Sequence, residues 1–497
     1  MYLLGYDLGS SSVKVSLLEA SSGKIIFSAQ SPASEMEIIA NQPGWAEQDP
    51  EMWWENLKIA TKKLKEKSGN NFQDIKAIGI SYQMHGLVLV DINQNVLRPS
   101  IIWCDSRAVE IGNDALNTLG KDFALSHLFN SPGNFTASKL SWVKKNEPEI
   151  FEKIHKAMLP GDFIAMKLSG EINTTASGLS EGIFWDFEEE KVAEFLLNIY
   201  QIPKSLLPDI VPTFSLQAKI LPKISEELGI NKEAFISYRA GDQPNNAFSL
   251  NVLKPGEVAA TAGTSGVIYG ISDEKKYDKT SSVNTFLHVN HVKENPSYGI
   301  LLCINGTGIL NSWLKNNIMD YLPNENIYNE MNEMAKTTKV GSEGLSILPF
   351  GNGAERVLEN KQLNASIHGL NFTQHNRSHL LRAAQEGIVF ALKYGLDKMK
   401  TLGVKPSKIK AGKANMFLSP LFSEAFANST GAVVELYNTD GATGAARGAG
   451  IGFGIYKNEA EAFHNLNIEQ TIEPDKILME HYDIAYNRWL GILENHL

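Results

Sequence analysis

Cysteine is scarce in this chain, which has 497 residues and only two cysteines, Cys104 and Cys303. They lie far apart and belong to no CxxC or Cys/His cluster, so neither a disulfide framework nor a zinc module is predicted. No apolar run approaches membrane length, and the first residues lack the basic start and apolar core of a secretory signal. We therefore expect a cytoplasmic protein with reduced thiols and no membrane partner.

Basic charge is also in short supply, since 46 lysines and arginines face 56 acidic residues and the net charge is −10. This balance provides no broad basic surface, so nucleic acid is not expected as a partner. Small anionic ligands remain compatible, because backbone N–H groups can hold phosphate on an acidic chain. Several motifs are missing as well: GxxxxGK[ST], a strand-linked GxGxxG, HExxH and GxSxG.

The composition is otherwise that of an ordinary globular protein, with 43% hydrophobic and 21% charged residues,. At about 100 to 200 residues per domain, the length predicts two to four domains. Strand-like and helix-like segments alternate, which predicts an α/β fold. Residues 253–256 interrupt this alternation with Leu-Lys-Pro-Gly, so we place a boundary near 250 and expect two related lobes, 1–250 and 251–497,.

Strand signals are clearest in the first half. Apolar runs at 3–8 and 13–18 flank a small polar turn and predict a hairpin,. Segments 75–82 and 87–91 are further strand candidates. A second strand-turn-strand unit occurs at 257–270, and its likeness to the first favours two related lobes,.

Helix signals are fewer but well marked. Asp49 followed by Pro50 is typical of a helix start and predicts a helix over 52–67,. The spacing of apolar residues predicts another helix over 376–400. The polar stretch 272–285 is expected to be a surface loop.

The first polar turn follows the first strand. Small residues in a tight turn expose N–H groups and hydroxyls to phosphate oxygens, and Asp7 at the strand end suits the ligand shell of Mg²⁺. Lys14 adds positive charge but can also point to solvent. An ordinary β-turn is the competing interpretation. The members of the turn are Gly9, Ser10, Ser11 and Ser12.

The second polar turn repeats this chemistry, and its members are Gly263, Thr264, Ser265 and Gly266. Alone it is no stronger than the first turn as evidence for phosphate binding. Two such turns would be able to clamp one polyphosphate from opposite lobes, and this raises the weight of both.

A third motif, residues 240–246, places Asp242 and Gln243 in a turn after a strand. A carboxylate there can accept a hydroxyl proton, and amides can orient a polyol. The competing interpretation is an Asx turn that only ends the strand.

A fourth constellation consists of residues 81–86 and 102–107. Polar groups at the carboxyl end of a strand are where α/β folds gather ligands. His85 can donate to a sugar hydroxyl, with Met84 and Trp103 in apolar contact. A purely structural histidine is the competing interpretation.

Two glycine-rich segments receive no assigned role at this point. Residues 350–356, FGNGAER, do not by themselves indicate a function. For residues 441–450, GATGAARGAG, small residues at helical spacing favour close helix packing over ligand binding.

Taken together, these motifs resemble the FGGY carbohydrate kinases over essentially the whole chain. Departures are Gln243, where the members that act on xylulose usually have asparagine, and Gln385, where an apolar residue is usual. The stretch 411–419, AGKANMFLS, replaces a glycine-rich adenosine loop. The matching segments are GYDLGSSSVKVSLLEA, QPGWAEQDPEMWW, QMHG, IIWCDSR, GNFTASKLSWVKKNEPEIF, ATAGTSGVIYG and SIHGLNFTQHNRSHLLRAAQEG.

The resemblance implies a two-lobe, actin/Hsp70-like (ribonuclease H-like) fold with a ligand cleft between lobes. It implies a sugar-binding lobe over 1–250 and an ATP-binding lobe over 251–497, with ATP and Mg²⁺ as cofactors. Asp242 is then the catalytic base and, with Asp7, a metal ligand. The implied sugar contacts are Met84, His85, Trp103, Asp242 and Gln243, and the implied nucleotide contacts are Gly9, Ser10, Ser11, Ser12, Lys14, Gly263, Thr264, Ser265, Gly308 and Gly412.

The implied reaction is ATP-dependent phosphorylation of a ketopentose, with D-xylulose as the first choice. Ribulose, another pentulose, glycerol or a deoxy sugar is the alternative acceptor. A non-catalytic, nucleotide-dependent binding protein on the same scaffold is the alternative of another class. The assembly considered is a homodimer.

Overall fold

The computed structural model describes residues 1–319 and 326–497 and divides the chain into two compact units. Each unit has its own sheet covered by helices, so the predicted α/β class is confirmed. The first unit comprises Met1–Asn251, Phe286–Tyr298 and Thr439–Leu466; the second comprises Val252–Thr285, Gly299–Asn438 and Asn467–Leu497.

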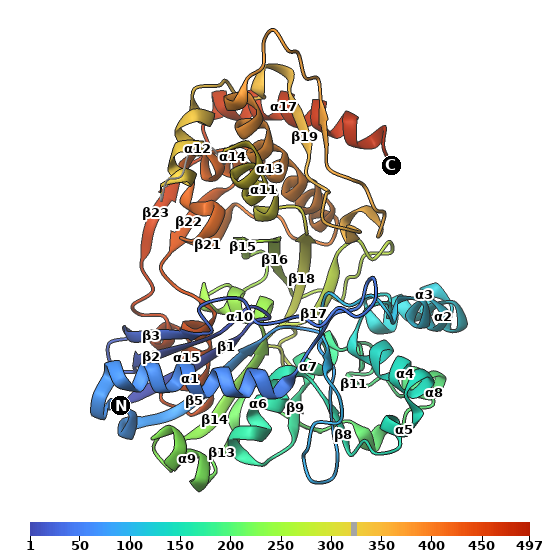
Figure 1. The fold of residues 1–497 in the computed structure, drawn as a ribbon, viewed down its shortest axis with the longest axis vertical. Helices are drawn as coiled ribbons and strands as arrows, with labels where there is room; N and C mark the ends of the chain where they lie inside the picture. Colours follow the sequence, from blue (N-terminus) through green and yellow to red (C-terminus); the bar gives the residue numbers. More distant parts are fainter. Residues whose placement is uncertain (320–325) are drawn as a thin grey trace. The chain divides into compact units, whose positions relative to one another are not determined.

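A six-stranded sheet organises the first unit (Figure 1). The predicted hairpin is confirmed, because β1 and β2 pair antiparallel. Strands β1, β5 and β14 are parallel neighbours, so their carboxyl ends share one edge,. In sheet order the strands are β13 (Phe214–Lys219), β14 (Phe235–Gly241), β5 (Ile75–Tyr82), β1 (Tyr2–Leu8), β2 (Val13–Glu19) and β3 (Ile25–Ser31).

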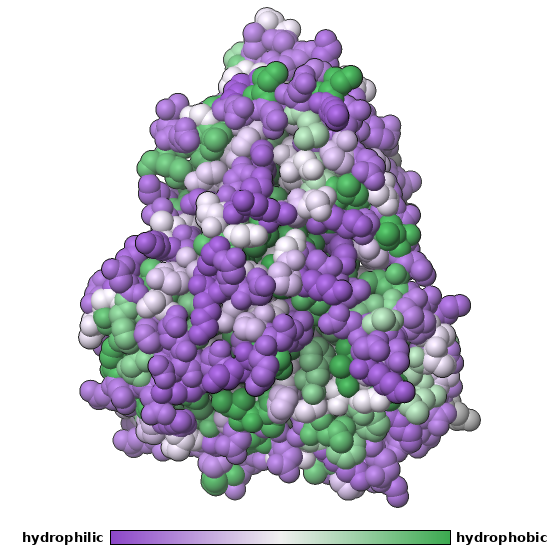
Figure 2. Space-filling model, turned by 180° about the vertical axis from the view of Figure 1, so that it is seen from behind, coloured by the Kyte–Doolittle hydropathy of each residue, from purple (hydrophilic) through white to green (hydrophobic). Residues whose placement is uncertain are grey.

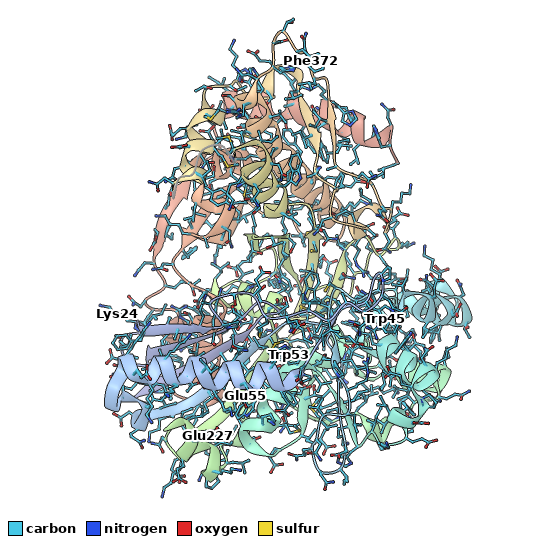
Figure 3. The ribbon with its side chains drawn as sticks, viewed as in Figure 1. Lys24, Trp45, Trp53, Glu55, Glu227 and Phe372 are labelled. Atoms are coloured by element: carbon cyan, nitrogen blue, oxygen red, sulfur yellow. The ribbon has the colours of Figure 1, made fainter. Side chains whose placement is uncertain are left out.

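Helices α1 (Pro50–Ser68) and α15 (Gly441–Gly452) cover opposite faces of this sheet. The predicted start of α1 is confirmed, since the Asp49 side chain accepts from the N–H of Glu51. On the exposed side of α1, Lys58 pairs with Glu55, labelled in Figure 3, at 2.7 Å. It also pairs at 3.2 Å with Glu227 of helix α9 (Pro222–Leu228).

Shorter elements complete the first unit. The strand candidate at 87–91 is observed as β6 (Val88–Val90). The remaining helices are η1 (Gly69–Asp74), α2 (Val109–Leu119), α3 (Lys121–Leu128), α4 (Thr136–Asn146), α5 (Pro148–Phe151), α6 (Pro160–Ser169), α7 (Ala176–Glu181), α8 (Glu194–Tyr200), η2 (Lys204–Leu206), α9 (Pro222–Leu228), α10 (Asp242–Ser249) and α16 (Glu459–Ala462). The remaining strands are β4 (Glu47–Gln48), β7 (Ser100–Ile101), β8 (Lys156–Met158), β9 (Asn173–Thr175), β10 (Trp185–Asp186), β11 (Lys191–Val192) and β12 (Asp209–Val211).

A seven-stranded sheet organises the second unit. The second predicted strand-turn-strand unit is confirmed as the antiparallel pair β15 and β16. Strands β15, β21 and β22 are parallel neighbours. In sheet order the strands are β17 (Asn284–Leu287), β18 (Tyr298–Ile304), β16 (Gly266–Ser272), β15 (Val258–Ala262), β21 (Lys408–Gly412), β22 (Val433–Tyr437) and β23 (Ile468–Ile472).

The predicted helix over 376–400 is confirmed as α13 (Arg377–Thr401), which packs against α12 and α14. The surface-loop prediction for 272–285 is wrong at its end, because residues 281–285 are buried and β17 begins at Asn284. The other elements are α11 (Gly308–Ile318), α12 (Ile327–Lys336), η3 (Ser342–Gly344), β19 (Ser346–Leu348), η4 (Arg356–Leu358), β20 (Ser366–His368), η5 (Asn415–Leu418), α14 (Pro420–Thr430) and α17 (Lys476–Glu494).

The surface is mainly polar. Figure 2 shows hydrophilic residues over much of the visible face, with apolar residues among them in small groups. Among residues 1–319 and 326–497, no helix is both long enough and apolar enough to cross a membrane.

Candidate functional site

Three polar residues lie where the parallel strands of the first unit end. Asp7 of β1 stands beside Ser81 of β5 in the ladder, and Ser81 Oγ donates to Asp7 Oδ1 at 2.8 Å. Gly241 ends β14, and Asp242 follows it directly. The carboxyl edge of the sheet therefore carries two aspartates and a serine, as expected for a ligand site in this fold class.

Burial dominates the electrostatics of this edge, and neighbouring carboxylates add to its effect. Burial and, to a smaller extent, the negative charge of Asp7 raise the pKa of Asp242 to about 7. Hydrogen bonds from Gln243 act in the opposite direction. Burial also raises the pKa of Asp7, with Ser81 and Lys14 lowering it. An aspartate that titrates near neutral pH is suited to accept a proton from a substrate.

The structure differs from the expected turn at Asp242. No turn intervenes, because Asp242 is the first residue of helix α10. The preceding Gly241 is enclosed by Glu181 and by Met84, whose Cγ would lie 2.6 Å from a side-chain carbon added at Gly241. Only glycine fits this gap, and the contact brings the Met84 segment against the Asp242 segment.

The first polar turn is held in place by a buried glutamine. The N–H of Gly9 donates to Ser12 O at 3.0 Å and closes the turn. Gln48 Nε2 donates to Ser10 O at 2.7 Å, and Gln48 Oε1 accepts from Gln83 at 3.1 Å and from the Trp53 ring N–H at 3.0 Å. The turn is thus tied to the end of β5 as well as to β1.

Lys14 lies on β2 directly opposite Asp7 in the antiparallel ladder. Its side chain is exposed, in agreement with the solvent-facing alternative, yet its charge lowers the pKa of Asp7. It also lines an open groove of about 690 Å³ that Asp440 borders. Lys14 is therefore near this edge without an ion pair to Asp7.

His85 follows the end of β5 and has a strained backbone conformation. Its φ of 62° lies in the left-handed region, which non-glycine residues rarely adopt,. Its Nδ1 donates to Glu181 O at 2.9 Å, and its ring packs on Phe135 and Phe286 with centroids 4.8 and 5.5 Å apart. The conformation is fixed from several sides, as is typical of functional positions.

Lys139 of α4 joins the two halves of the fourth constellation. Its side chain is fully buried and Nζ donates to His85 O at 2.9 Å and to Ile102 O at 2.8 Å. Burial lowers the pKa of Lys139 to about 7, while the charges of Asp105 and Cys104 oppose this. Lys139 therefore holds Ile102 beside His85, and the half-exposed Trp103 is the next residue in the chain.

A buried ion-pair network supports the segment 102–107. Arg107 pairs with Asp105 at 2.6 Å and with Glu47 at 2.6 Å. Its guanidinium lies 3.8 Å from the ring centroid of Trp45, labelled in Figure 3, and 4.8 Å from that of Trp142. An arginine that is paired and stacked in this way is rigid, so the segment that carries Trp103 is held in a fixed position.

The glycine-rich segment 441–450 forms α15, and the packing interpretation is confirmed. A side-chain carbon at Gly5 or Gly79 of the sheet would clash with the α15 backbone at Ala442 or Ala445. Asp440 caps the helix, its side chain accepting from the N–H of Thr443 at 2.8 Å. The negative charge of Asp440 raises the pKa of Asp7, so the helix start also belongs to this edge.

The second polar turn lies in the second unit between β15 and β16. The N–H of Gly308 donates to Gly263 O at 2.9 Å, and that of Ile309 donates to Thr264 O at 3.2 Å. Gly308 is the first residue of α11, and any larger residue there would clash with Gly263 O. The turn therefore sits on the start of α11, whose positive end favours anions.

Gly412 ends β21, one strand away from this turn. The stretch after it forms η5 and ends at Ser419, which caps α14. Ser419 Oγ donates to Gln385 Oε1 at 2.9 Å, and Gln385 Nε2 donates to Asn332 at 2.9 Å. Gln385, which stands where an apolar residue is usual, is thus hydrogen-bonded. Its partner Ser419 ends the stretch 411–419, the other segment that departs from the family pattern.

Each unit gathers part of the predicted set. The first unit contains Asp7, Gly9, Ser10, Ser11, Ser12, Lys14, Met84, His85, Trp103, Asp242 and Gln243, and the second contains Gly263, Thr264, Ser265, Gly308 and Gly412. The residues that the sequence analysis missed include Gln48, Lys139, Glu181, Glu355 and Asp440. Asp440 had a usable signal, because an aspartate directly before a small-residue helix is typical of an N-cap.

Comparison with known proteins agrees with this arrangement. Residues 2–249 match the N-terminal domain of the FGGY family of carbohydrate kinases, and residues 258–452 match its C-terminal domain. The xylulose kinase of Escherichia coli (strain K12) is 28% identical over 481 residues, covering 96% of this chain and 95% of that protein. The chain belongs to the FGGY family and is a carbohydrate kinase.

Solved structures bear out the predicted fold. The xylulose kinase from Rhodospirillum rubrum has a TM-score of 0.87 at 24% identity, covering 100% of this chain and 99% of that chain. The gluconate kinase from Lactobacillus acidophilus has a TM-score of 0.89 at 23% identity, covering 99% and 98%. The two-lobe, actin-like α/β fold is therefore confirmed.

Proposed function

We propose that this enzyme transfers the γ-phosphoryl group of ATP to O5 of D-xylulose, with Asp242 as the general base. The observation that carries the proposal is the position of Asp242 at the carboxyl edge of the first sheet, with a pKa raised to about 7. The similarity to xylulose kinases over nearly the full length supports the choice of sugar.

In this mechanism Asp242 accepts the O5 proton as the O5–phosphorus bond forms and the bond to the leaving ADP breaks. Gln243 hydrogen-bonds Asp242 and so orients its carboxylate toward the hydroxyl. Phosphoryl transfer depends mainly on positioning and on neutralising charge, so a base contributes only part of the rate.

The sugar-binding residues in this proposal are Met84, His85, Trp103 and Gln243. His85 is fixed by its bond to Glu181 O and by two aromatic rings, and Met84 packs beside Gly241. A mixed polar and apolar surface of this kind is suited to a polyol, whose hydroxyls need partners and whose carbons need contact.

Nucleotide phosphates are assigned to the two polar turns, where exposed hydroxyls and N–H groups suit anionic oxygens. Asp7 and Asp242 fit a magnesium ion, because both are hard oxygen ligands, both are buried, and the charge of Asp7 raises the pKa of Asp242,. Bound there, Mg²⁺ would neutralise charge on the transferring phosphoryl group.

The proposal is tested with purified enzyme by measuring ADP release over D-xylulose, D-ribulose, L-xylulose, glycerol, a deoxy sugar and gluconate. We expect D-xylulose to give the highest kcat/KM. A tenfold preference for another acceptor would replace the sugar while keeping the kinase chemistry. If none of these acceptors gained mass in the presence of ATP, the proposed transfer to D-xylulose would be contradicted.

The role of Asp242 is tested separately with Asp242→Asn. We expect kcat to fall by about 10²–10⁴-fold, since general-base assistance is removed, while D-xylulose binding stays measurable by calorimetry. Asp209→Asn, an exposed aspartate of the same unit, is the matched control and should leave kcat unchanged. Wild-type kinetics in the Asp242 variant would rule out this base.

A further inference from the structure

Residues 350–355 form a loop between β19 and η4 and have no role in the reaction described above. Within it, Glu355 is completely buried although glutamate is normally a surface residue,. A buried carboxylate is costly unless it is hydrogen-bonded, so its partners indicate what it is there to hold.

The partners of Glu355 are backbone groups of the turn after β18. The N–H of Asn305 donates to both carboxylate oxygens at 3.0 Å, and the N–H of Gly306 donates to Oε1 at 3.2 Å. The Asn305 side chain donates in return to Ala354 O at 2.9 Å. One side chain therefore fixes two successive peptide groups of a neighbouring loop.

These peptide groups lead directly into the second polar turn. Thr307 follows them, and Gly308 then begins α11 with its N–H bonded to Gly263 O. Gly266, the last residue of the turn, is close to Thr307, because a carbon added at Gly266 would lie 2.6 Å from Thr307 Oγ1. Moving residues 305–307 would thus move the turn at 263–266.

We propose that Glu355 is a positioning residue for the phosphate-binding turn at 263–266, acting through the backbone of Asn305 and Gly306. The inference rests on the proposed function in one respect, the assignment of nucleotide phosphates to this turn. In this proposal Glu355 contacts no substrate and sets the geometry of the turn through the backbone groups that it binds.

Glu355 must be ionised to accept these hydrogen bonds on both of its carboxylate oxygens. A carboxylate accepts on both oxygens, whereas a protonated or amide side chain presents a donor to N–H groups that are themselves donors. Burial outweighs the lowering effect of the bonds from Asn305 and Gly306 and raises the pKa of Glu355 to about 7.

The charged and titratable neighbours of Glu355 in the described structure include Arg356 beside it in the chain and Lys361, whose carbonyl accepts from the Glu355 N–H. They also include Glu359, whose N–H donates to Arg356 O, and Cys303 of β18, whose charge acts on Arg356. Since the folded pKa lies near 7, nucleotide affinity should fall as the pH drops through that value. If Glu355 had the usual glutamate pKa of 4.5, the nucleotide affinity would fall only at a much lower pH.

The first experiment uses the wild-type enzyme and needs no variant. ADP binding is measured by calorimetry between pH 5.5 and 8.5 without sugar, so that neither catalysis nor the identity of the acceptor enters. We expect the affinity to weaken below about pH 7 by up to tenfold per unit. Constant affinity across this range, after correction for the titration of ADP itself, would overturn the role of the charge.

The second experiment compares Glu355→Gln with Glu359→Gln, an exposed control four residues further on. We expect Glu355→Gln to weaken ADP binding about tenfold, to raise KM for ATP similarly and to abolish the pH dependence, with KM for the sugar little changed. If the variant is unstable, Asn305→Ala removes the bond to Ala354 O and should weaken ADP binding with the pH dependence retained.

The outcomes separate the two proposals. Equal losses for ATP and sugar in Glu355→Gln would show a general structural role and overturn the positioning role. In the wild-type enzyme, pH-dependent ADP binding with no phosphorylated sugar would leave the Glu355 inference intact and contradict the proposed function. Unchanged ADP affinity and pH dependence in Glu355→Gln would refute the inference while the kinase assignment stands.

Discussion

At the scale of single residues, the titration of Asp242 makes a direct prediction about rate. The base must be ionised, and its pKa is raised to about 7 by burial and by Asp7, so kcat should rise with pH up to that value and then level off,. Asp7→Asn removes one source of the shift and should move the rising limb to lower pH, whatever its effect on the maximum. A limb that stays in place would contradict the coupling. Stopped-time assays over pH 5 to 9 give both profiles.

The same shift has a consequence for stability. Because the folded pKa of Asp242 lies above its unfolded value of 3.8, the folded chain holds the proton more tightly between these two values,. Stability from this group is therefore present at low pH and is lost as the pH rises through about 7. We attribute the cost to function, since a crowded carboxylate edge is useful to a kinase and unfavourable to the fold.

Lys139 supports a second prediction at this scale. Replacing it with methionine keeps the apolar stem and removes the bonds to His85 O and Ile102 O. We expect KM for the sugar to rise about tenfold or more, because the left-handed His85 loses its support, with KM for ATP changing much less. Lys144→Met on the same helix is the control, since Lys144 is bonded to the distant carbonyl of Gln201. Equal changes in both KM values would point to general loosening instead.

At the scale of elements, the contact between α15 and the sheet predicts a measurable cost. A methyl group at Gly79 of β5 would overlap the carbonyl of Ala445, so Gly79→Ala should destabilise the protein by about 1–3 kcal/mol or more,. Gly491→Ala is an informative control in helix α17. Nothing lies within 4 Å of its added carbon, and alanine is favoured over glycine in helices, so this change should stabilise by up to about 1 kcal/mol,. Urea unfolding of the two variants should show shifts of opposite sign.

Elements were also the scale at which the sequence was most informative. Alternating apolar residues predicted β1, β2 and β5, and the Asp49–Pro50 pair predicted the start of α1, because such signals are local. The helical start at Asp242 was missed, since a Gly-Asp pair after a strand is equally typical of a turn. Glu355 and Lys139 had no local signal at all. Their roles depend on bonds to carbonyls and N–H groups far away in the chain, and these are set only by the fold.

At the scale of the whole molecule, the chain order and the compact units do not coincide. The first unit takes in residues 439–466, so that α15 packs on β1, β5 and β14, whereas β22, which precedes α15 in the chain, belongs to the second unit. The lobe boundary near 250 stays a prediction for the family domains. The composition of the first unit implies that residues near the end of the chain are needed to complete a sheet that begins at residue 2.

This organisation predicts how the intact protein opens under mild denaturant. The amides of α15 should exchange with deuterium at the rate of β1 and β5, because glycine-mediated contacts bury the helix against those strands,. They should not follow β21 and β22, their nearer neighbours in sequence. Hydrogen exchange read by mass spectrometry at rising urea concentration measures all of these segments in one sample, and α16 of the same unit provides an internal comparison. If α15 lost protection together with β22 while β1 stayed protected, the helix would contribute little to the first unit, and the destabilisation expected for Gly79→Ala would have to arise within the sheet alone.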